Sequence, residues 1–134
     1  MNGDWNAAHD TGYDDIDAQH RDLFRAHTMA CEASRAGDAP AVAAAIEALV
    51  EATREHFAFE EGLMATSHFP GREMHAEAHR LFMSDLGALA AQVRRNPGSP
   101  VVRLWLDSRL ASWWKRHVTS NDAALAAHLA RKVA

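Results

Sequence analysis

Three clusters of glycine, proline and small polar residues divide this chain into four segments. They lie at residues 36–40 (AGDAP), 67–71 (SHFPG) and 96–100 (NPGSP). Clusters of this kind interrupt helices. Between them, apolar residues recur every three or four positions, as at Val42, Ile46 and Leu49, which is the period of an amphipathic helix. The pattern predicts an all-α fold, an antiparallel up-down-up-down four-helix bundle over residues 16–118.

The two ends of the chain are expected to differ from the bundle. Residues 1–15 are rich in Asp and Gly and predict an irregular N-terminal arm. The run Thr-Ser-Asn-Asp at 119–122 predicts a terminal turn that caps a short C-terminal helix over 123–132. Because 134 residues is the length of one compact domain, we expect a single domain over 1–134.

Composition excludes several classes of partner. With 14 basic and 18 acidic residues the net charge is −4, and no Lys/Arg cluster is present to neutralise phosphates or anionic lipid. This argues against nucleic acid and membrane partners. Cys31 is the one cysteine and has no partner for an intramolecular disulfide. The start of the chain has no basic leader and no stretch is apolar enough to span a bilayer, so we expect a cytoplasmic monomer.

Polar residues occupy positions that the helical period assigns to the core. In an antiparallel bundle, the start of the first helix, the end of the second, the start of the third and the end of the fourth lie at the same end. Seven inward histidines and carboxylates fall in these four places: His20, His56, Glu60, His75, His79, His117 and Asp122. Because unpaired polar groups are costly in a core, something must bind them.

The spacing of these residues indicates how they converge. Glu60 follows His56 by four residues, and His79 follows His75 by four, so each pair lies on one helix face. Asp122 follows His117 by five, which on a regular helix turns it about 140° away. The spacing therefore predicts a wide turn or bulge near residues 119–121 that points Asp122 inward.

The donor set indicates the metal. Five imidazoles and two carboxylates suit a borderline first-row metal such as iron, and the lack of nearby cysteine argues against a sulfur-rich zinc or cluster site. Seven ligands are too many for one tetrahedral ion. They suit two metals bridged by the carboxylates, because a carboxylate has two oxygens.

The order of these residues resembles the hemerythrins, particularly the single-domain bacterial ones. The motifs are Asp17-Ala18-Gln19-His20, His56-x-x-x-Glu60, His75-x-x-x-His79 and His117-x-x-x-x-Asp122. Supporting features are Trp5, the Glu60-Glu61 pair after Phe57, the Phe69-Pro70 turn, and Trp113. The resemblance covers nearly the whole chain.

The resemblance implies a non-haem diiron centre that binds dioxygen reversibly. His75, His79 and His117 would hold one iron and His20 and His56 the other, with Glu60, Asp122 and an oxo or hydroxo group as bridges. Dioxygen would bind at an open position on the second iron. The role would be oxygen storage, transport or delivery to an oxygen-consuming partner, without enzymatic turnover. Apolar candidates for the oxygen pocket are Leu23, Phe24, Phe57, Trp113, Trp114 and Val118.

Two residues depart from the family pattern. Trp114 stands where we expect a leucine-like residue, so it either narrows the oxygen pocket or turns outward. His27 shares the stripe of His20 and is expected either to hydrogen-bond within the core or to reach a neighbouring group; it is not assigned as a metal ligand. The remaining histidines, His9, His68 and His128, are expected at the surface.

Two other functions compete with an oxygen carrier. A diiron oxidase, peroxidase or nitric-oxide-handling enzyme of the ferritin-like type would use Glu-x-x-His pairs, which this chain lacks. A sensory module would report oxygen or redox state to an output domain. The chain ends at Ala134 without a linker or output, which we read as evidence against a sensor.

Overall fold

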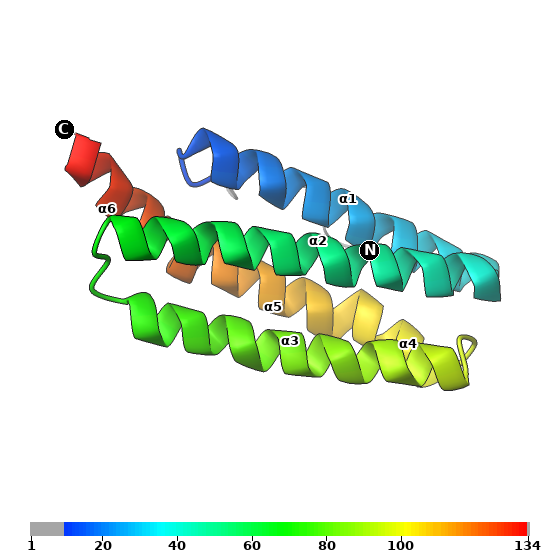
Figure 1. Ribbon diagram of the computed structural model, residues 1–134. Coiled ribbons are helices and arrows are strands. Elements are labelled where there is room, and N and C mark those ends of the chain that lie inside the picture. Colours follow the sequence, from blue (N-terminus) through cyan, green and yellow to red (C-terminus); the bar gives the residue numbers. More distant parts are fainter. Residues whose placement is uncertain (1–9, 134) are drawn as a thin grey trace.

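The computed structural model describes residues 10–133, and side chains up to residue 131, as a bundle of helices (Figure 1). The bundle has four long helical units, which we call rods. The first three rods are the single helices α1 (Asp14–Ala36), α2 (Ala39–Thr66) and α3 (Arg72–Arg95). The fourth comprises α4 (Pro100–Leu104), η2 (Trp105–Leu110), α5 (Ala111–Arg116), η3 (His117–Asp122) and α6 (Ala123–Val133). No strand occurs in this part of the chain, so the predicted all-α bundle is confirmed.

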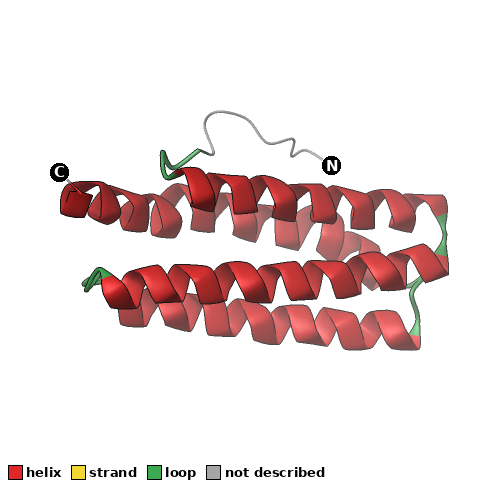
Figure 2. Ribbon diagram, turned by 45° about the horizontal axis from the view of Figure 1, so that its top comes forward, coloured by secondary structure: helices red, strands yellow, loops and turns green. Residues whose placement is uncertain are grey.

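The four rods run side by side, with short connections at both ends (Figure 2). Helix α2 packs against α1 and α3, and the start of the fourth rod packs against α1 and α3. The predicted arm lies mostly outside the described residues, and with it Trp5 and His9. Its last two residues, Asp14 and Asp15, are already helical, because acidic side chains in a first turn are favoured by the helix dipole.

The connection between α1 and α2 shows how the sequence sets the helix ends. Gly37 adopts a left-handed conformation (φ 69°), and its N–H and that of Asp38 bond the carbonyls of Ser34 and Ala33. The Asp38 side chain then accepts a hydrogen bond from the Ala41 N–H at 3.1 Å and caps α2. The predicted break at residues 36–40 is therefore two helix caps in direct succession.

The fourth rod differs from the prediction at its C-terminal end. The run 119–122 does not end the helix; it lies in η3, a π-helical stretch that continues directly into α6. The Thr119 and Ser120 hydroxyls donate to the carbonyls of Lys115 (2.7 Å) and Arg116 (2.5 Å), so these side chains occupy backbone acceptors instead of capping a new helix. The predicted bulge is present, but the predicted terminal turn is wrong.

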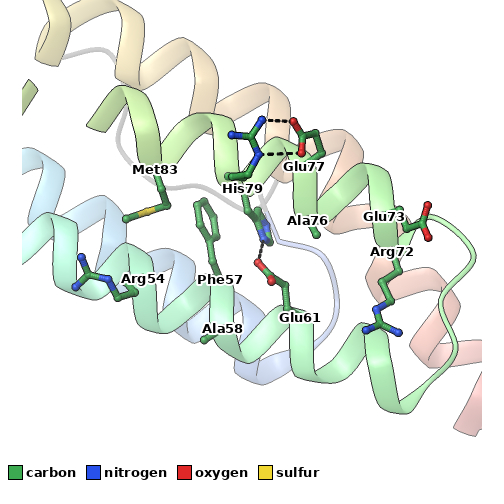
Figure 3. Close-up of a pocket in the computed structure, with 11 residues that line it drawn as sticks. Arg54, Phe57, Ala58, Glu61, Arg72, Glu73, Ala76, Glu77, His79 and Met83 are labelled. Atoms are coloured by element: carbon green, nitrogen blue, oxygen red, sulfur yellow. Dashed lines mark hydrogen bonds and ion pairs between the residues drawn. The ribbon is translucent and has the colours of Figure 1, made fainter. Parts of the chain in front are cut away.

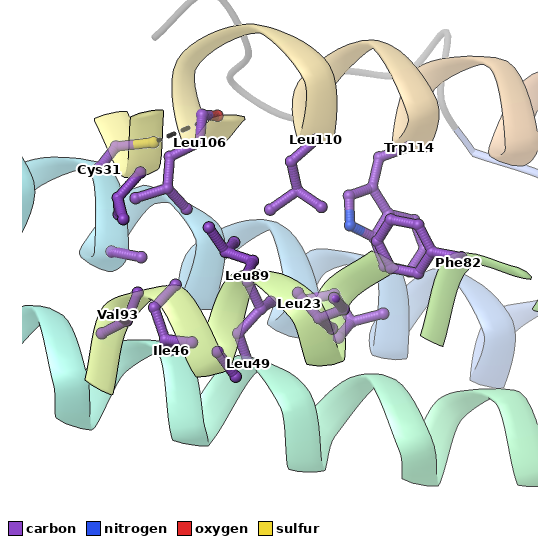
Figure 4. Close-up of a cluster of buried hydrophobic side chains, with 14 of the residues drawn as sticks. Leu23, Cys31, Ile46, Leu49, Phe82, Leu89, Val93, Leu106, Leu110 and Trp114 are labelled. Atoms are coloured by element: carbon purple, nitrogen blue, oxygen red, sulfur yellow. Dashed lines mark hydrogen bonds between the residues drawn. The ribbon is translucent and has the colours of Figure 1, made fainter. Parts of the chain in front are cut away.

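Two apolar clusters flank the end of the bundle where the polar residues lie. The larger fills the bundle interior and includes Leu23, Leu49, Leu89 and Leu110 (Figure 4). The smaller consists of Ile16, Met64, Leu125 and Leu129. Since Ile16 precedes His20 by one turn and Leu23 follows it by one, the polar layer is enclosed by apolar side chains on both sides.

His27 forms a hydrogen bond within the core, the first of the two alternatives expected of it. Its side chain is fully buried, and its Nε2 lies 2.6 Å from the carbonyl oxygen of Leu106, in η2. The Cys31 thiol lies 3.8 Å from the same carbonyl, and burial raises the pKa of this thiol to about 11. A π-helical turn leaves backbone carbonyls to be satisfied by side chains, and His27 serves one of them.

Replacing His27 with Gln should make the protein less sensitive to acid. Burial lowers the pKa of His27 below 6.5 in the folded chain, so below pH 6.5 the unfolded chain binds a proton that the folded chain does not. The stability that depends on a neutral His27 is therefore complete above pH 6.5 and is lost as the pH falls toward the folded pKa. Urea unfolding of the unaltered protein and of His27→Gln, measured from pH 6.5 downward, tests this prediction. An equal loss of unfolding free energy in the two proteins would contradict it.

The remaining described histidines differ in their exposure to solvent. His68 is exposed, as expected, but the surface position predicted for His128 is wrong. His128 is only 9% exposed; its Nε2 lies 2.9 Å from the Ser67 carbonyl oxygen and its ring packs on Phe69. Helix α6 continues past the α2–α3 connection, which covers this side chain. Among residues 10–133, no helix combines the length and apolar character needed to cross a bilayer.

Candidate metal centre

All seven predicted polar residues meet in one buried layer. Each rod supplies at least one of them, and every one of the seven side chains is at most 3% exposed. They are His20 of α1, His56 and Glu60 of α2, His75 and His79 of α3, and His117 and Asp122 of η3. Within the described chain, these are the residues grouped closely enough to hold a metal ion.

The seven residues form two overlapping groups. One group contains three histidines and both carboxylates: His75, His79, His117, Glu60 and Asp122. The other contains two histidines and the same two carboxylates: His20, His56, Glu60 and Asp122. In each group the potential ligand atoms all lie within 4.8 Å of one another. We call them the three-histidine half and the two-histidine half.

Glu60 divides its two oxygens between the halves. Its Oε1 lies 3.1 Å from His79 Nε2 and 3.4 Å from His75 Nε2. Its Oε2 lies 3.2 Å from His56 Nε2 and 3.8 Å from His20 Nε2. Each oxygen therefore faces the imidazoles of one half.

Asp122 is placed in the same way. Its Oδ1 lies 2.9 Å from His75 Nε2 and 3.0 Å from His117 Nε2, whereas its Oδ2 lies 2.7 Å from His20 Nε2. The π-helical turn of η3 makes this possible, because its wider turns bring residues five apart toward one face. Two carboxylates that each span both halves have the arrangement of bridging ligands.

The nitrogen and oxygen atoms of this layer are arranged to bind a cation rather than to hydrogen-bond with one another. None of the four oxygens of Glu60 and Asp122 receives a hydrogen bond of regular geometry within the described residues, although imidazole nitrogens lie close to each. The Nε2 atoms of His79 and His117 are 3.2 Å apart, a close approach of two potential ligand atoms. Buried polar groups without regular hydrogen bonds are costly unless an ion binds them, and these are nitrogen and oxygen ligands of the kind that bind first-row metals.

The pKa values of the carboxylates favour their ionised form. Burial by itself raises the pKa of Glu60, but its contacts with His56, His75 and His79 outweigh burial and lower the pKa below its ordinary range. The pKa of Asp122 is likewise lowered, since its contacts with imidazoles more than offset the opposing effect of burial. Both side chains are therefore anionic and available as ligands.

Two imidazoles respond oppositely to this environment. Burial lowers the pKa of His117 and keeps its ring neutral, which ligation requires. Burial acts in the same direction on His75, but its contacts with Asp122 and Glu60 dominate and raise the pKa to about 9. In the metal-free protein a proton on His75 thus compensates part of the buried negative charge, and a metal ion must displace it.

Two further residues hold the outer nitrogens of the histidines. His56 Nδ1 lies 2.6 Å from Gln19 Oε1, and His79 Nδ1 lies 2.9 Å from Glu61 Oε2. Both residues belong to the sequence motifs, yet the motifs gave neither of them a role. Because each contact joins side chains of two different helices, the spacing of residues along one helix does not reveal it.

Several of the apolar residues predicted for an oxygen pocket lie beside this layer: Phe57, Trp113 and Trp114 contact its imidazoles, and Leu23 lines a cleft with His56. Leu23, Phe24, Phe57, Trp114 and Val118 are buried, whereas Trp113 is partly buried and stacks on His117 with ring centroids 4.4 Å apart. Trp114 does not turn outward: its ring centroid is 6.4 Å from that of His20 and 6.3 Å from that of His56. The outward alternative is therefore wrong, and a narrower oxygen pocket beside the two-histidine half stays a prediction. Phe57 stacks on His79 at 3.7 Å, a contact that the sequence did not predict.

Comparison with known families agrees with the site. The model of the hemerythrin HHE cation-binding domain matches residues 11–129, which contain all seven residues of the layer. A bacteriohemerythrin of Pseudomonas paraeruginosa is 31% identical over 119 residues, covering 89% of this chain and 76% of the relative. A bacteriohemerythrin of Stenotrophomonas maltophilia is 30% identical over 91% of this chain and 78% of the relative. A myohemerythrin of Riftia pachyptila is 34% identical over 65% of this chain and 68% of the relative.

Proposed function

Because this chain belongs to the hemerythrin family, with the HHE cation-binding domain spanning residues 11–129, we propose that it binds dioxygen reversibly at a non-haem diiron centre. The seven buried residues would be the metal ligands. The observation that supports two irons rather than one is that Glu60 and Asp122 belong to both donor groups, with one oxygen of each directed to each half.

The two halves would hold their metals unequally. His75, His79 and His117 with the two carboxylates offer five protein ligands, whereas His20 and His56 with the same carboxylates offer four. A pair of ferrous ions, when bound, supplies two electrons and a coordination position for dioxygen. The half with fewer protein ligands is where that position would remain open.

The two-histidine half has a polar outer side and an apolar interior side, and the interior side suits a small apolar ligand. A cleft of about 110 Å³ reaches His56 between α1 and α2; Leu23 and Ala52 line it together with the polar side chains of Gln19, Asp22 and Glu55. Trp114 and Leu23 wall the interior side. Apolar walls exclude water and protons, which protects a reversible adduct from irreversible oxidation. The side chains therefore favour reversible binding of dioxygen over its chemical conversion. The protein would store, transport or deliver dioxygen to an oxygen-consuming partner.

Anaerobic reduction followed by exposure to oxygen tests the proposal. We expect two irons per chain and a visible absorption band that appears with oxygen and disappears under vacuum over repeated cycles. Resonance Raman spectra recorded with the two common oxygen isotopes should contain an isotope-sensitive vibration. Consumption of oxygen that depends on an added substrate, without a stable band, would instead identify an oxidase or peroxidase.

A further inference from the structure

His56 and His79 both have side-chain partners on their outer nitrogens, and these two partners differ in charge. His79, in the three-histidine half, faces the carboxylate of Glu61 at 2.9 Å. His56, in the two-histidine half, faces the neutral amide of Gln19 at 2.6 Å. Both imidazoles are almost fully buried, so each outer contact is a main determinant of how its ring is held.

The position of the proton on each ring follows from the atom that its Nδ1 faces. Nδ1 of each ring faces an acceptor oxygen, and Nε2 faces the polar layer, where its lone pair would bind the metal; the proton of the metal-bound ring is therefore on Nδ1. Nδ1–H of His56 then donates to Gln19, and Nδ1–H of His79 donates to Glu61. A carboxylate acceptor draws this proton more strongly than an amide does, which makes the ring a stronger electron donor through Nε2.

We propose that Glu61 and Gln19 are positioning residues that make the two halves of the centre electronically unequal. The Glu61–His79 pair increases electron donation to the metal of the three-histidine half and stabilises its oxidised state. The neutral Gln19–His56 pair leaves the metal of the two-histidine half less electron-rich. This inference rests on the proposed diiron function.

Glu61 contacts a buried ring while its own side chain reaches solvent. Figure 3 shows Glu61 extending from α2 toward His79 of α3; both residues line a groove between the two helices. The groove has a volume of about 890 Å³, and the Glu61 side chain is 46% exposed within it. Glu61 thus brings a hydrated negative charge into direct contact with a ligand that solvent does not reach. Phe57, stacked on His79, fixes the plane of the ring.

Exchanging the two kinds of partner tests the inference. We expect Glu61→Gln to raise the reduction potential of the diiron centre and Gln19→Glu to lower it. Each tenfold change in the preference for ferric over ferrous iron corresponds to about 59 mV. Glu73→Gln is the matched control, because Glu73 lines the same groove and its replacement removes the same charge, whereas among residues 10–133 it forms no hydrogen bond or ion pair with a buried histidine. Spectroelectrochemical titration of the four proteins gives the potentials.

A zinc-loaded form gives a second readout that does not depend on iron or oxygen. Zinc is diamagnetic, so the Nδ1–H resonances of His79 and His56 can be followed by NMR. Glu61→Gln should move the His79 resonance selectively and weaken zinc binding by about 10–100-fold, the usual cost of losing an outer partner. Equal shifts in Glu61→Gln and Glu73→Gln would overturn the inference alone. Fewer than two irons in the unaltered protein would overturn the proposed function first.

Discussion

Replacing Glu60 with alanine should abolish binding of both metals, whereas replacing His117 with alanine should chiefly empty the three-histidine half. Glu60 is fully buried and contributes an oxygen to each half, while His117 belongs to one half only. The loss of affinity in Glu60→Ala should exceed the roughly 10–100-fold that follows removal of an outer partner. Iron and zinc content per chain, measured after loading the metal-free protein, tests both variants.

The control for this prediction is Glu51→Ala. Glu51 lies on the same helix but at the surface, where it pairs with Arg54 at 2.5 Å, so its loss should leave the metal content unchanged. Circular dichroism separates loss of ligand from loss of fold. If Glu60→Ala is folded and retains two irons per chain, Glu60 is not a bridging ligand and the arrangement proposed here is wrong.

Replacing Trp114 with alanine should destabilise the protein by about 3–5 kcal/mol and shorten the lifetime of the oxygenated form. The indole is 5% exposed and packs against rings on three other helices: His20, Phe57 and Phe82, at centroid distances of 6.4, 6.0 and 5.4 Å. Its removal leaves a cavity beside the two-histidine half. Since that cavity adjoins polar ligands, water can enter and promote irreversible oxidation.

Trp114→Phe separates the two effects of this substitution. Phenylalanine retains most of the apolar wall, so this variant should lose less stability and keep an oxygenated form that lasts longer than that of Trp114→Ala. Urea unfolding gives the stability, and decay of the visible band in air gives the lifetime. Decay rates that are equal in both variants and in the unaltered protein would show that Trp114 does not protect the site.

The sequence predicted the polar layer because periodicity and helix order are sufficient to locate it. His56 and Glu60 share a face by their four-residue spacing, and the alternation of helix direction brings both to the end of the bundle where α3 begins and carries His75. The five-residue spacing of His117 and Asp122 required a bulge, and η3 provides it. These inferences depend only on residues along one helix and on the direction of its neighbours.

Features that depend on contacts between elements were not predictable in the same way. His128 was assigned to the surface because nothing in its own helix indicates that Ser67 and Phe69 cover it. The run 119–122 resembles a helix cap in isolation, but its hydroxyls bond preceding carbonyls and the helix continues. The partners of His56 and His79 come from outside their own stripes, so spacing alone could not assign roles to Gln19 and Glu61.

Anomalous diffraction at the iron absorption edge, from crystals of the iron-loaded protein, tests the arrangement most directly. We expect two peaks roughly 3.5–4 Å apart, as in other two-metal sites, with one oxygen of Glu60 and one of Asp122 beside each peak. A single peak, or two peaks that do not share these carboxylates, would contradict the assignment of both residues as bridges.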